Sequence, residues 1–231
     1  MSEPARARHR TVLAALRGLD ADFLARAECY FGGGTRIVLG LGEYRESADV
    51  DFLCASREGY RALRSTVSDA SLGSIAKTPL RLAREVIADR YGIRTFLDVE
   101  GEKLKLEIIL EGRIGLAGGI VNGLPVAALD EASCCAEKFL ANADRWGDES
   151  VLGRDVIDLA FMAARWGTEP VRAGLATATA VYGKAVTRDA KRAATKMLER
   201  ADWRRRCVTA LGITDTRTLL GGLRTVAAAR W

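Results

Sequence analysis

The chain has 231 residues, of which 48% are hydrophobic and 28% are charged, and its formal net charge is +5. This length suits one large domain or two small ones, and the apolar content excludes a disordered chain. No apolar run is long enough to span a bilayer, and charges interrupt any signal-like segment near the N-terminus. We therefore expect a cytoplasmic protein without a membrane partner.

The first half of the sequence alternates between helical and β-type patterns. One helix is predicted over residues 8–26, followed by a short edge strand over 27–31 that runs into a glycine turn. A turn within Glu100-Gly101-Glu102 predicts a hairpin. The other expected elements are helices over 35–41 and 57–69, a loop over 42–47, and strands over 48–54, 84–89, 92–99, 103–110 and 124–128.

From Asp130 onward, alanine, leucine, arginine and lysine dominate, which is typical of helices. The sequence therefore predicts an α+β protein. Residues 1–129 would form a core with a mixed β-sheet flanked by helices, and residues 130–231 would form a helical bundle. The expected helices of the bundle cover about 130–145, 154–166, 168–181, 187–200 and 215–229.

Three glycines and a threonine, Gly32-Gly33-Gly34-Thr35, connect the first strand to the next helix. A glycine turn that opens a helix can present backbone N–H groups to a phosphate, and the Thr35 hydroxyl could add a further donor. The alternative is a tight turn that needs glycine only for its conformation. The stretch lacks both the P-loop ending and the GxGxxG spacing, so taken alone it favours the structural alternative.

Two aspartates, Asp49 and Asp51, are spaced by two residues in an apolar run. On a strand this spacing points both carboxylates to the same face. Two like charges this close repel unless a cation compensates them, and hard divalent cations prefer oxygen ligands. Because Phe52 and Leu53 indicate a buried strand, metal binding is favoured over a solvated polar face.

Glu107 is the third candidate acid and lies in a strand with clean alternation, Lys103 to Ile108. Lys103, Lys105 and Glu107 share one face of that strand. If the strand pairs beside the Asp49–Asp51 strand, Glu107 completes a three-carboxylate cluster able to hold two Mg²⁺ ions. The alternative is a salt bridge to Lys105 or another base.

The helical half contains a second candidate set. Lys138 and Arg145 are seven residues apart and share a helix face, while Asp155 and Asp158 open the next helix. The basic residues could meet nucleotide phosphates, with an aspartate orienting them or the acceptor. Early acids also suit the helix dipole, and without further support that structural role is favoured.

Charge is unevenly placed along the chain. Residues 181–231 hold twelve Lys/Arg and four Asp/Glu, a net of +8. Such a segment suits a polyanion such as RNA, and equally suits the solvated face of a bundle. Five cysteines without a Cys-x-x-Cys spacing, and a single histidine at position 9, argue against a zinc site or a histidine-based triad.

Together these residues resemble the nucleotidyltransferase signature of the polymerase-β-like superfamily, through Gly33-Gly34-Thr35, Asp49-Val50-Asp51 and Glu107. The segment from Glu137-Lys138 to Arg145, and then Arg154-Asp155 to Asp158, is similar to the AbiEii/AbiGii toxin family. Members are bacterial nucleotidyltransferase toxins of toxin–antitoxin and phage-defence systems. The resemblance spans about residues 28–166.

The resemblance implies a nucleotidyltransferase core and a helical bundle with the active site in the cleft between them. Gly33, Gly34 and Thr35 would hold the triphosphate, and Asp49, Asp51 and Glu107 would bind Mg²⁺, with two ions expected and Mn²⁺ as an alternative. The expected residues of the helical half are Lys138, Arg145 and Asp155 for the nucleotide and Asp158 in catalysis.

The implied function is transfer of NMP from an NTP to an acceptor hydroxyl, with in-line attack and release of pyrophosphate. RNA is the expected acceptor, with the 3′ end of tRNA as the first choice, and a cognate antitoxin is an expected partner. The alternatives are modification of a protein or an antibiotic, and a non-catalytic relative that binds nucleotide or RNA.

Overall fold

The computed structural model describes residues 3–229 and divides into two compact units. The first unit comprises the chain up to Leu39 together with Ser47–Asp130. The second comprises Gly40–Glu46 and the residues from Glu131 onward. Composition alone placed a single boundary near residue 129, whereas the contacts also assign the short Gly40–Glu46 segment to the helical unit.

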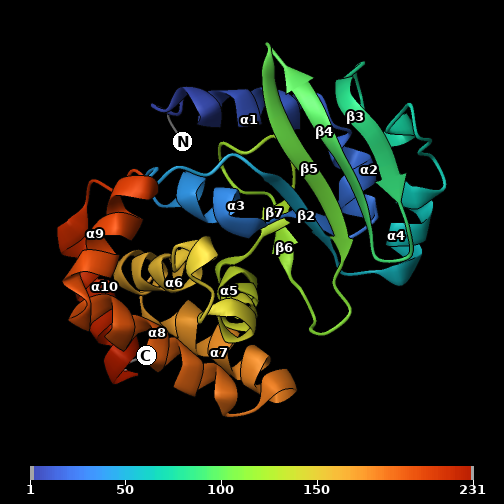
Figure 1. Cartoon of the computed structure of the whole chain (residues 1–231). Helices are drawn as coiled ribbons and strands as arrows, with labels where there is room; N and C mark the ends of the chain where they lie inside the picture. The colour runs from blue at the N-terminus through green and yellow to red at the C-terminus, as the bar shows by residue number, and fades with distance from the viewer. Residues whose placement is uncertain (1–2, 230–231) are drawn as a thin grey trace. The chain divides into compact units, whose positions relative to one another are not determined.

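The first unit is built on one mixed sheet of seven strands in the order β3-β4-β5-β2-β1-β7-β6 (Figure 1). β2 pairs with β5 in parallel and with β1 in antiparallel orientation. The strands are β1 (Cys29–Phe31), β2 (Val50–Cys54), β3 (Arg81–Ala88), β4 (Gly92–Val99), β5 (Glu102–Leu110), β6 (Gly118–Gly119) and β7 (Ala128–Leu129).

Alternating burial positions the polar residues of the central strands. Val50, Phe52 and Cys54 of β2 are buried, so Asp51 and Leu53 lie on the opposite, more open face. β5 follows the same pattern, with Leu104, Leu106 and Ile108 buried and Glu107 on the open face. The alternation predicted for residues 103–108 is therefore confirmed.

Two strand predictions need correction, and one short strand was missed. β1 was expected at an edge of the sheet, but it lies between β2 and β7, so both of its edges are paired. The strand expected over 124–128 is reduced to Ala128–Leu129, and it pairs with the two-residue strand β6, which the sequence pattern did not indicate. The hairpin is confirmed, since Glu100 and Gly101 both adopt positive φ between β4 and β5.

Two helix predictions in this unit are also corrected. The single helix expected over 8–26 is broken at Gly18, and Asp20 caps a second helix by accepting a hydrogen bond from Phe23 N at 2.7 Å. The helix expected over 57–69 ends at Arg64, where Ser65 and Thr66 turn their hydroxyls back to backbone carbonyls. The helical segments of this unit are α1 (Ala7–Arg17), α2 (Ala21–Arg26), α3 (Gly33–Gly40), α4 (Arg57–Arg64) and the short η1 (Gly73–Ile75).

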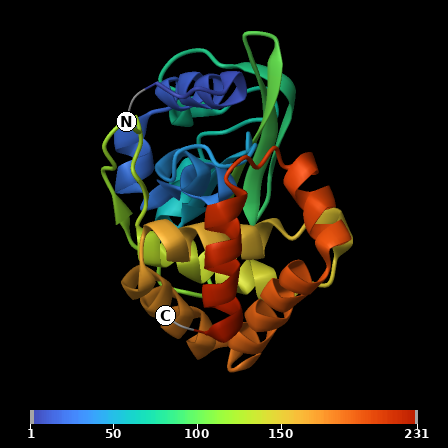
Figure 2. The same cartoon turned by 90° about the vertical axis from the view of Figure 1, so that its left-hand side faces the viewer.

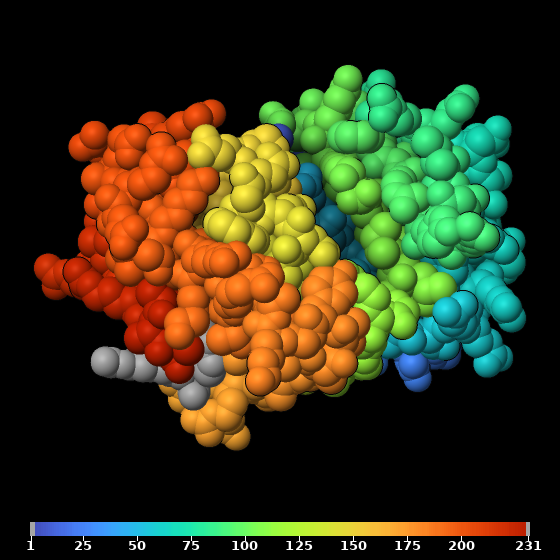
Figure 3. All heavy atoms as spheres, turned by 60° about the horizontal axis from the view of Figure 1, so that its bottom comes forward, coloured from blue at the N-terminus to red at the C-terminus, as the bar shows by residue number. Residues whose placement is uncertain are grey.

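Helices form the second unit, and they fill one continuous body in yellow to red (Figure 3). One of them was missed: α9 spans a stretch for which no element was predicted, because its arginine-rich sequence hides the buried pair Trp203 and Cys207. Among the described residues, no helix combines the length and apolar character needed to cross a bilayer. The helical segments are α5 (Glu131–Arg145), η2 (Glu149–Val151), α6 (Arg154–Arg165), α7 (Thr168–Tyr182), α8 (Ala185–Glu199), α9 (Ala201–Ala210) and α10 (Thr216–Ala228).

A close helix crossing holds this unit together. α10, drawn in red in Figure 2, packs against α6 at Gly222. A Cβ atom added there would lie 2.0 Å from the backbone oxygen of Ala160, so only glycine fits without moving a helix. The preceding Gly221 faces open space, with no atom within 4 Å of such a Cβ.

These neighbours make a matched pair of substitutions. Gly222→Ala should lower the free energy of unfolding by about 1–3 kcal/mol, because the helices must separate to admit the methyl group. Gly221→Ala should raise it by up to about 1 kcal/mol, because alanine is the better helix former. Urea unfolding followed by circular dichroism measures both, and equal effects would contradict the packing described here.

Candidate active site

The glycine turn is built directly against Asp51. Gly32 N donates a hydrogen bond to the backbone oxygen of Asp51 at 2.8 Å. Gly33 has a φ of +66°, and a Cβ added to it would lie 2.2 Å from Oδ2 of Asp51. Position 33 therefore needs glycine both for its conformation and for the space that the carboxylate occupies.

Helix α3 begins at this turn, so its first N–H groups have no partner within the helix. Backbone donors of this kind can hold a phosphate, which is the role predicted for Gly33 and Gly34. Thr35 is placed differently from that expectation. Its side chain is fully buried, and its hydroxyl shares a hydrogen bond with Ser47 at 2.9 Å, so it braces the turn from inside.

Asp51 and Glu107 are brought together by strand pairing. They are direct partners in the parallel ladder of β2 and β5, and both lie on the open face. Asp49 is exposed and precedes β2 by one residue. The predicted pairing of the two acid-bearing strands is thus present, and it places Glu107 beside Asp51.

The Glu107 carboxylate already has cationic neighbours. Lys105 Nζ lies 2.6 Å from its Oε2, and Arg94 Nε lies 3.5 Å from its Oε1. Throughout residues 3–229, no three His, Cys, Asp or Glu side chains are close enough to share a metal ion. The three-carboxylate cluster is therefore not assembled in this arrangement, and Glu107 makes the salt bridge weighed as its alternative.

The chemical types of the residues at this turn and strand nevertheless suit a magnesium–nucleotide complex. Mg²⁺ is usually bound by one or two protein carboxylates, with water and substrate phosphates completing its coordination. Asp49, just before β2, and Asp51, within it, offer two carboxylates, and Gly33 sets a candidate phosphate cradle against the second. A preassembled three-acid site is not needed for this mode of binding.

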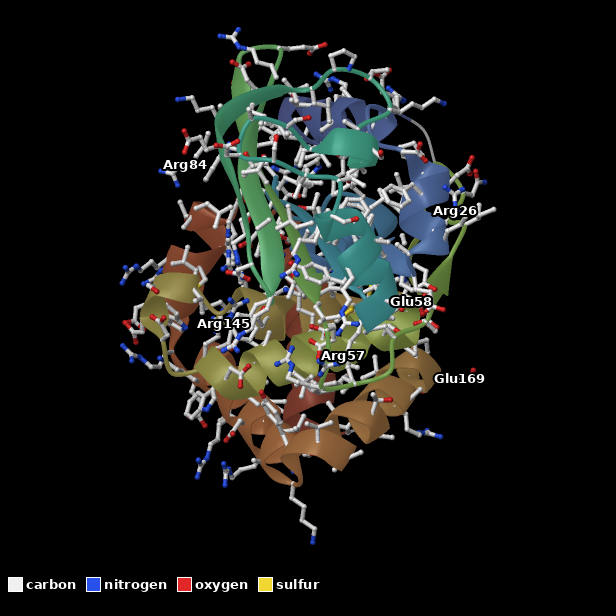
Figure 4. The ribbon with its side chains drawn as sticks, turned by 90° about the vertical axis from the view of Figure 1, so that its right-hand side faces the viewer. Arg26, Arg57, Glu58, Arg84, Arg145 and Glu169 are labelled. Carbon is white, nitrogen blue, oxygen red and sulfur yellow. The ribbon has the colours of Figure 1, made fainter. Side chains whose placement is uncertain are left out.

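The second unit contains a buried ionic cluster. Lys138 Nζ lies 2.9 Å from Asp155 Oδ1 and 2.8 Å from Asp158 Oδ2. Arg145, which is partly exposed and labelled in Figure 4, donates to Asp155 through Nε at 2.7 Å and Nη2 at 3.0 Å. The structure thus brings together all four site residues predicted in the helical half.

Two further members of this cluster were missed by sequence reasoning. Tyr44 OH donates to Asp158 Oδ1 at 2.6 Å, and Arg45 donates to both oxygens of Asp158 at 2.7 and 2.8 Å. Both residues belong to the Gly40–Glu46 segment of the helical unit, and both lie in the stretch 42–47 that was predicted to be a loop. The Tyr44 ring also stacks on Phe161, with ring centroids 3.9 Å apart.

Comparison with known proteins now identifies the kind of protein. A family profile described as nucleotidyl transferase AbiEii toxin, type IV toxin–antitoxin system, matches residues 14–219. The chain belongs to this family. The predicted family is thereby confirmed, and the protein is a nucleotidyltransferase.

Solved structures support the fold of this AbiEii family member. JHP933 from Helicobacter pylori has a TM-score of 0.52 at 15% identity, over 96% of this chain and 91% of that one. An H. pylori protein described as a candidate nucleotidyltransferase has a TM-score of 0.51 at 14% identity, over 96% and 94%. No curated protein sequence matches the chain. The predicted α+β fold class is confirmed.

Membership also sets the general chemistry. An AbiEii nucleotidyltransferase transfers NMP from a nucleoside triphosphate, and the family generally uses a divalent metal. Membership in a family of toxin–antitoxin toxins implies a cognate antitoxin. The roles of the individual residues, the identity of the metal and the acceptor remain predictions.

The electrostatics of the helical cluster are dominated by burial and by opposite charge. Burial acts to raise the pKa of Asp158, but Arg45 and Lys138 outweigh it and hold that pKa below its usual value. Burial likewise acts to lower the pKa of Lys138, and the two aspartates outweigh it and raise that pKa. Asp158 has 0% exposure and accepts four contacts, so it holds the side chains of Tyr44, Arg45 and Lys138 in place within the fold.

Asp158→Asn should therefore destabilise the AbiEii protein by about 3–5 kcal/mol at pH 7, because Arg45 and Lys138 lose a buried counter-charge. Since the pKa is depressed in the folded state, the carboxylate contributes its full stability above the unfolded value, about 3.9, and loses it as pH falls through the folded value. The difference from wild type should persist down to about pH 4 and shrink below it.

Urea unfolding at stepped pH measures this difference. Glu199→Gln is the matched control, because it removes one acid from an exposed position on α8 of the same unit. An Asp158→Asn variant as stable as the control at pH 7 would contradict the structural role given to the cluster.

Proposed function

We propose that this AbiEii nucleotidyltransferase transfers NMP to a hydroxyl of RNA, with the 3′ end of tRNA as the preferred acceptor. The observation that carries the proposal is the contact between the glycine turn and the acidic strand. Gly33 leaves room for the Asp51 carboxylate, so a phosphate held by the turn would lie beside that acid. This is the arrangement that a metal-chelated triphosphate requires.

Each residue of the first unit takes a distinct role in the proposal. The backbone of Gly33 and Gly34 binds triphosphate oxygens, and Thr35 fixes the turn from the interior. Asp49 and Asp51 hold the divalent metal. Glu107, the partner of Asp51 in the β2–β5 ladder, adds a carboxylate to the same face of the sheet. Mg²⁺ is the proposed metal, with two ions at work and Mn²⁺ as a substitute. When bound, it neutralises phosphate charge and lowers the pKa of the acceptor hydroxyl.

The transfer step balances without a further reagent. The acceptor oxygen forms a bond to the α-phosphorus, and the bond from that phosphorus to the bridging oxygen of pyrophosphate breaks. The hydroxyl proton passes to the Glu107 carboxylate. Lys105 lies on the strand surface at 40% exposure, so it can swing away from Glu107 and free an oxygen for this proton.

In the second unit, Lys138 and Arg145 are the proposed nucleotide-binding cations. Asp155 bonds to both, and Asp158 fixes Lys138 from the other side. These aspartates orient the cations rather than meet the reacting atoms. Orientation of charged groups before the reaction is the main way in which a protein accelerates phosphoryl transfer.

RNA is favoured as the acceptor by the charge of the chain. The last 51 residues carry a net charge of +8, which is the sign required by a phosphate backbone. Transfer to tRNA would also explain toxicity, since a modified 3′ end blocks translation. We therefore expect the enzyme to act in the cytoplasm.

Incubation with total RNA and each of the four α-³²P-labelled NTPs tests the proposal. We expect a labelled band of tRNA size with at least one NTP, and loss of label by at least a hundredfold in Asp49→Ala and Asp51→Ala. Asp98→Ala is the control, because it removes an acid of the same sheet at the rim of β4. RNA whose terminal diol has been oxidised with periodate should accept no label.

Two outcomes would contradict the proposal separately. Unchanged labelling in both aspartate variants would remove the metal assignment. Label that appears only on protein would remove RNA as the acceptor and leave the metal assignment standing.

A further inference from the structure

A groove in the first unit is lined by arginines that the proposed reaction does not use. Two adjoining hollows of about 190 and 490 Å³ share Arg57, Arg90 and Leu110 in their walls. They lie against α4 and the turn between β3 and β4. We call this feature the arginine groove, and its functional side chains are Arg57, Arg61, Arg64, Arg90, Tyr60 and Tyr91.

Helical spacing gathers three of these cations. Arg57, Arg61 and Arg64 are four and three residues apart, so they project from one face of α4. Tyr60, which borders the hollow, and Leu63 anchor the helix in the core at 2% and 0% exposure. Figure 4 shows Arg57 at the start of this helix.

Arg90 completes the set from the β3–β4 turn. All four arginines are exposed, and among residues 3–229 none of them makes an ion pair. Glu58 follows Arg57 on α4 but forms no ion pair with these cations within the same described range. Four neighbouring positive charges that form no ion pairs favour the binding of an anion.

The groove has a fixed wall. Tyr60 OH donates to the backbone oxygen of Asp89 at 2.7 Å, which ties α4 to the turn. Asp89 Oδ1 accepts hydrogen bonds from Tyr91 N at 2.7 Å and Gly92 N at 2.9 Å. Leu110 N donates to the backbone oxygen of Tyr91 at 3.1 Å. The turn therefore presents Arg90 and Tyr91 in a set position.

An aromatic face accompanies the charge. Tyr91 is 58% exposed, and the guanidinium carbon of Arg90 lies 4.6 Å from the centre of its ring. Guanidinium groups bind phosphates through paired hydrogen bonds, and exposed aromatic rings stack on unpaired bases. This combination suits a single-stranded nucleic acid better than an acidic protein, because the protein offers carboxylates but no bases to stack on the ring.

The groove also lies within reach of the acidic strand. Arg57 follows Asp51 by six residues, which limits their separation to about 20 Å of extended chain. At about 3.4 Å per phosphate, about six stacked nucleotides would span this upper limit. We propose that the arginine groove binds the single-stranded segment of the RNA acceptor immediately upstream of its reacting hydroxyl. This inference rests on the proposed function.

The test compares two triple variants with the same change in charge. Arg57→Gln/Arg61→Gln/Arg64→Gln removes the α4 cations of the groove. Arg8→Gln/Arg17→Gln/Arg26→Gln removes three exposed arginines from α1 and α2 of the same unit. Because all six side chains are exposed, both variants should fold, and circular dichroism with thermal melting confirms this.

The probe is a fluorescein-labelled single-stranded RNA of 20 nucleotides, with binding followed by anisotropy without NTP at several salt concentrations. We expect the groove variant to bind at least tenfold more weakly at low salt. Its plot of log affinity against log salt should be shallower by about 2, since three phosphate contacts are lost. The control variant should change neither quantity by more than about twofold. Tyr91→Ala should weaken binding by about tenfold with an unchanged salt slope.

Several results would overturn the groove. One is equal behaviour of the two triple variants, and another is failure of the wild type to bind the RNA. A third is a groove variant that loses binding of polyglutamate but retains binding of RNA, which would assign the groove to an acidic protein partner. The transfer assay separates the two proposals. If RNA binding depends on the groove but RNA is not labelled, the proposal of an RNA acceptor fails and the groove proposal stands. If labelling of RNA is unaffected in the groove variant, the proposal of an RNA acceptor stands and the groove proposal fails.

Discussion

The need for glycine at position 33, where there is no room for a side chain, is the constraint on which the first unit depends. Glycine allows α3 to begin against the Asp51 carboxylate, at a φ that other residues rarely adopt. The parallel pairing of β2 with β5 then sets Glu107 beside Asp51. The N-terminus of α3 and an acidic strand face are thus joined by ordinary sheet geometry, and the buried residues of both strands hold them in register.

The helical unit buries several charged side chains, and it does so without loss of stability because each is paired with an opposite charge. Asp158 is completely buried, and Tyr44, Arg45 and Lys138 saturate its two oxygens. Such a cluster stabilises a fold only while every member is present, because one missing partner leaves a buried charge unpaired. A short segment from the first half of the sequence therefore belongs structurally to this unit, fixed by its Tyr44-Arg45 pair.

Local sequence patterns predicted which residues share a face of a strand or helix, because strand alternation and helical spacing determine that. The alternation in β5 placed Glu107 on the open face, and the seven-residue interval placed Lys138 and Arg145 together on α5. Long-range partners were beyond those patterns. Arg45 meets Asp158 across 113 residues, and nothing local to a loop indicates that its arginine is buried. Thr35 was read as a phosphate ligand because the sequence does not reveal that its hydroxyl faces Ser47.

Nucleotide binding measured without turnover tests the central claim, that the Gly33 turn and the Asp51 face form one metal–triphosphate site. Isothermal titration calorimetry with an α,β-methylene NTP that the enzyme cannot cleave, in MgCl₂ and in EDTA, compares the wild type with Asp51→Asn and Gly33→Ala. Gly115→Ala is the control, because nothing lies within 4 Å of its added methyl group. We predict metal-dependent binding that is retained in the control and weakened by at least tenfold in both other variants. Binding of equal affinity in EDTA, or in Asp51→Asn, would contradict the account.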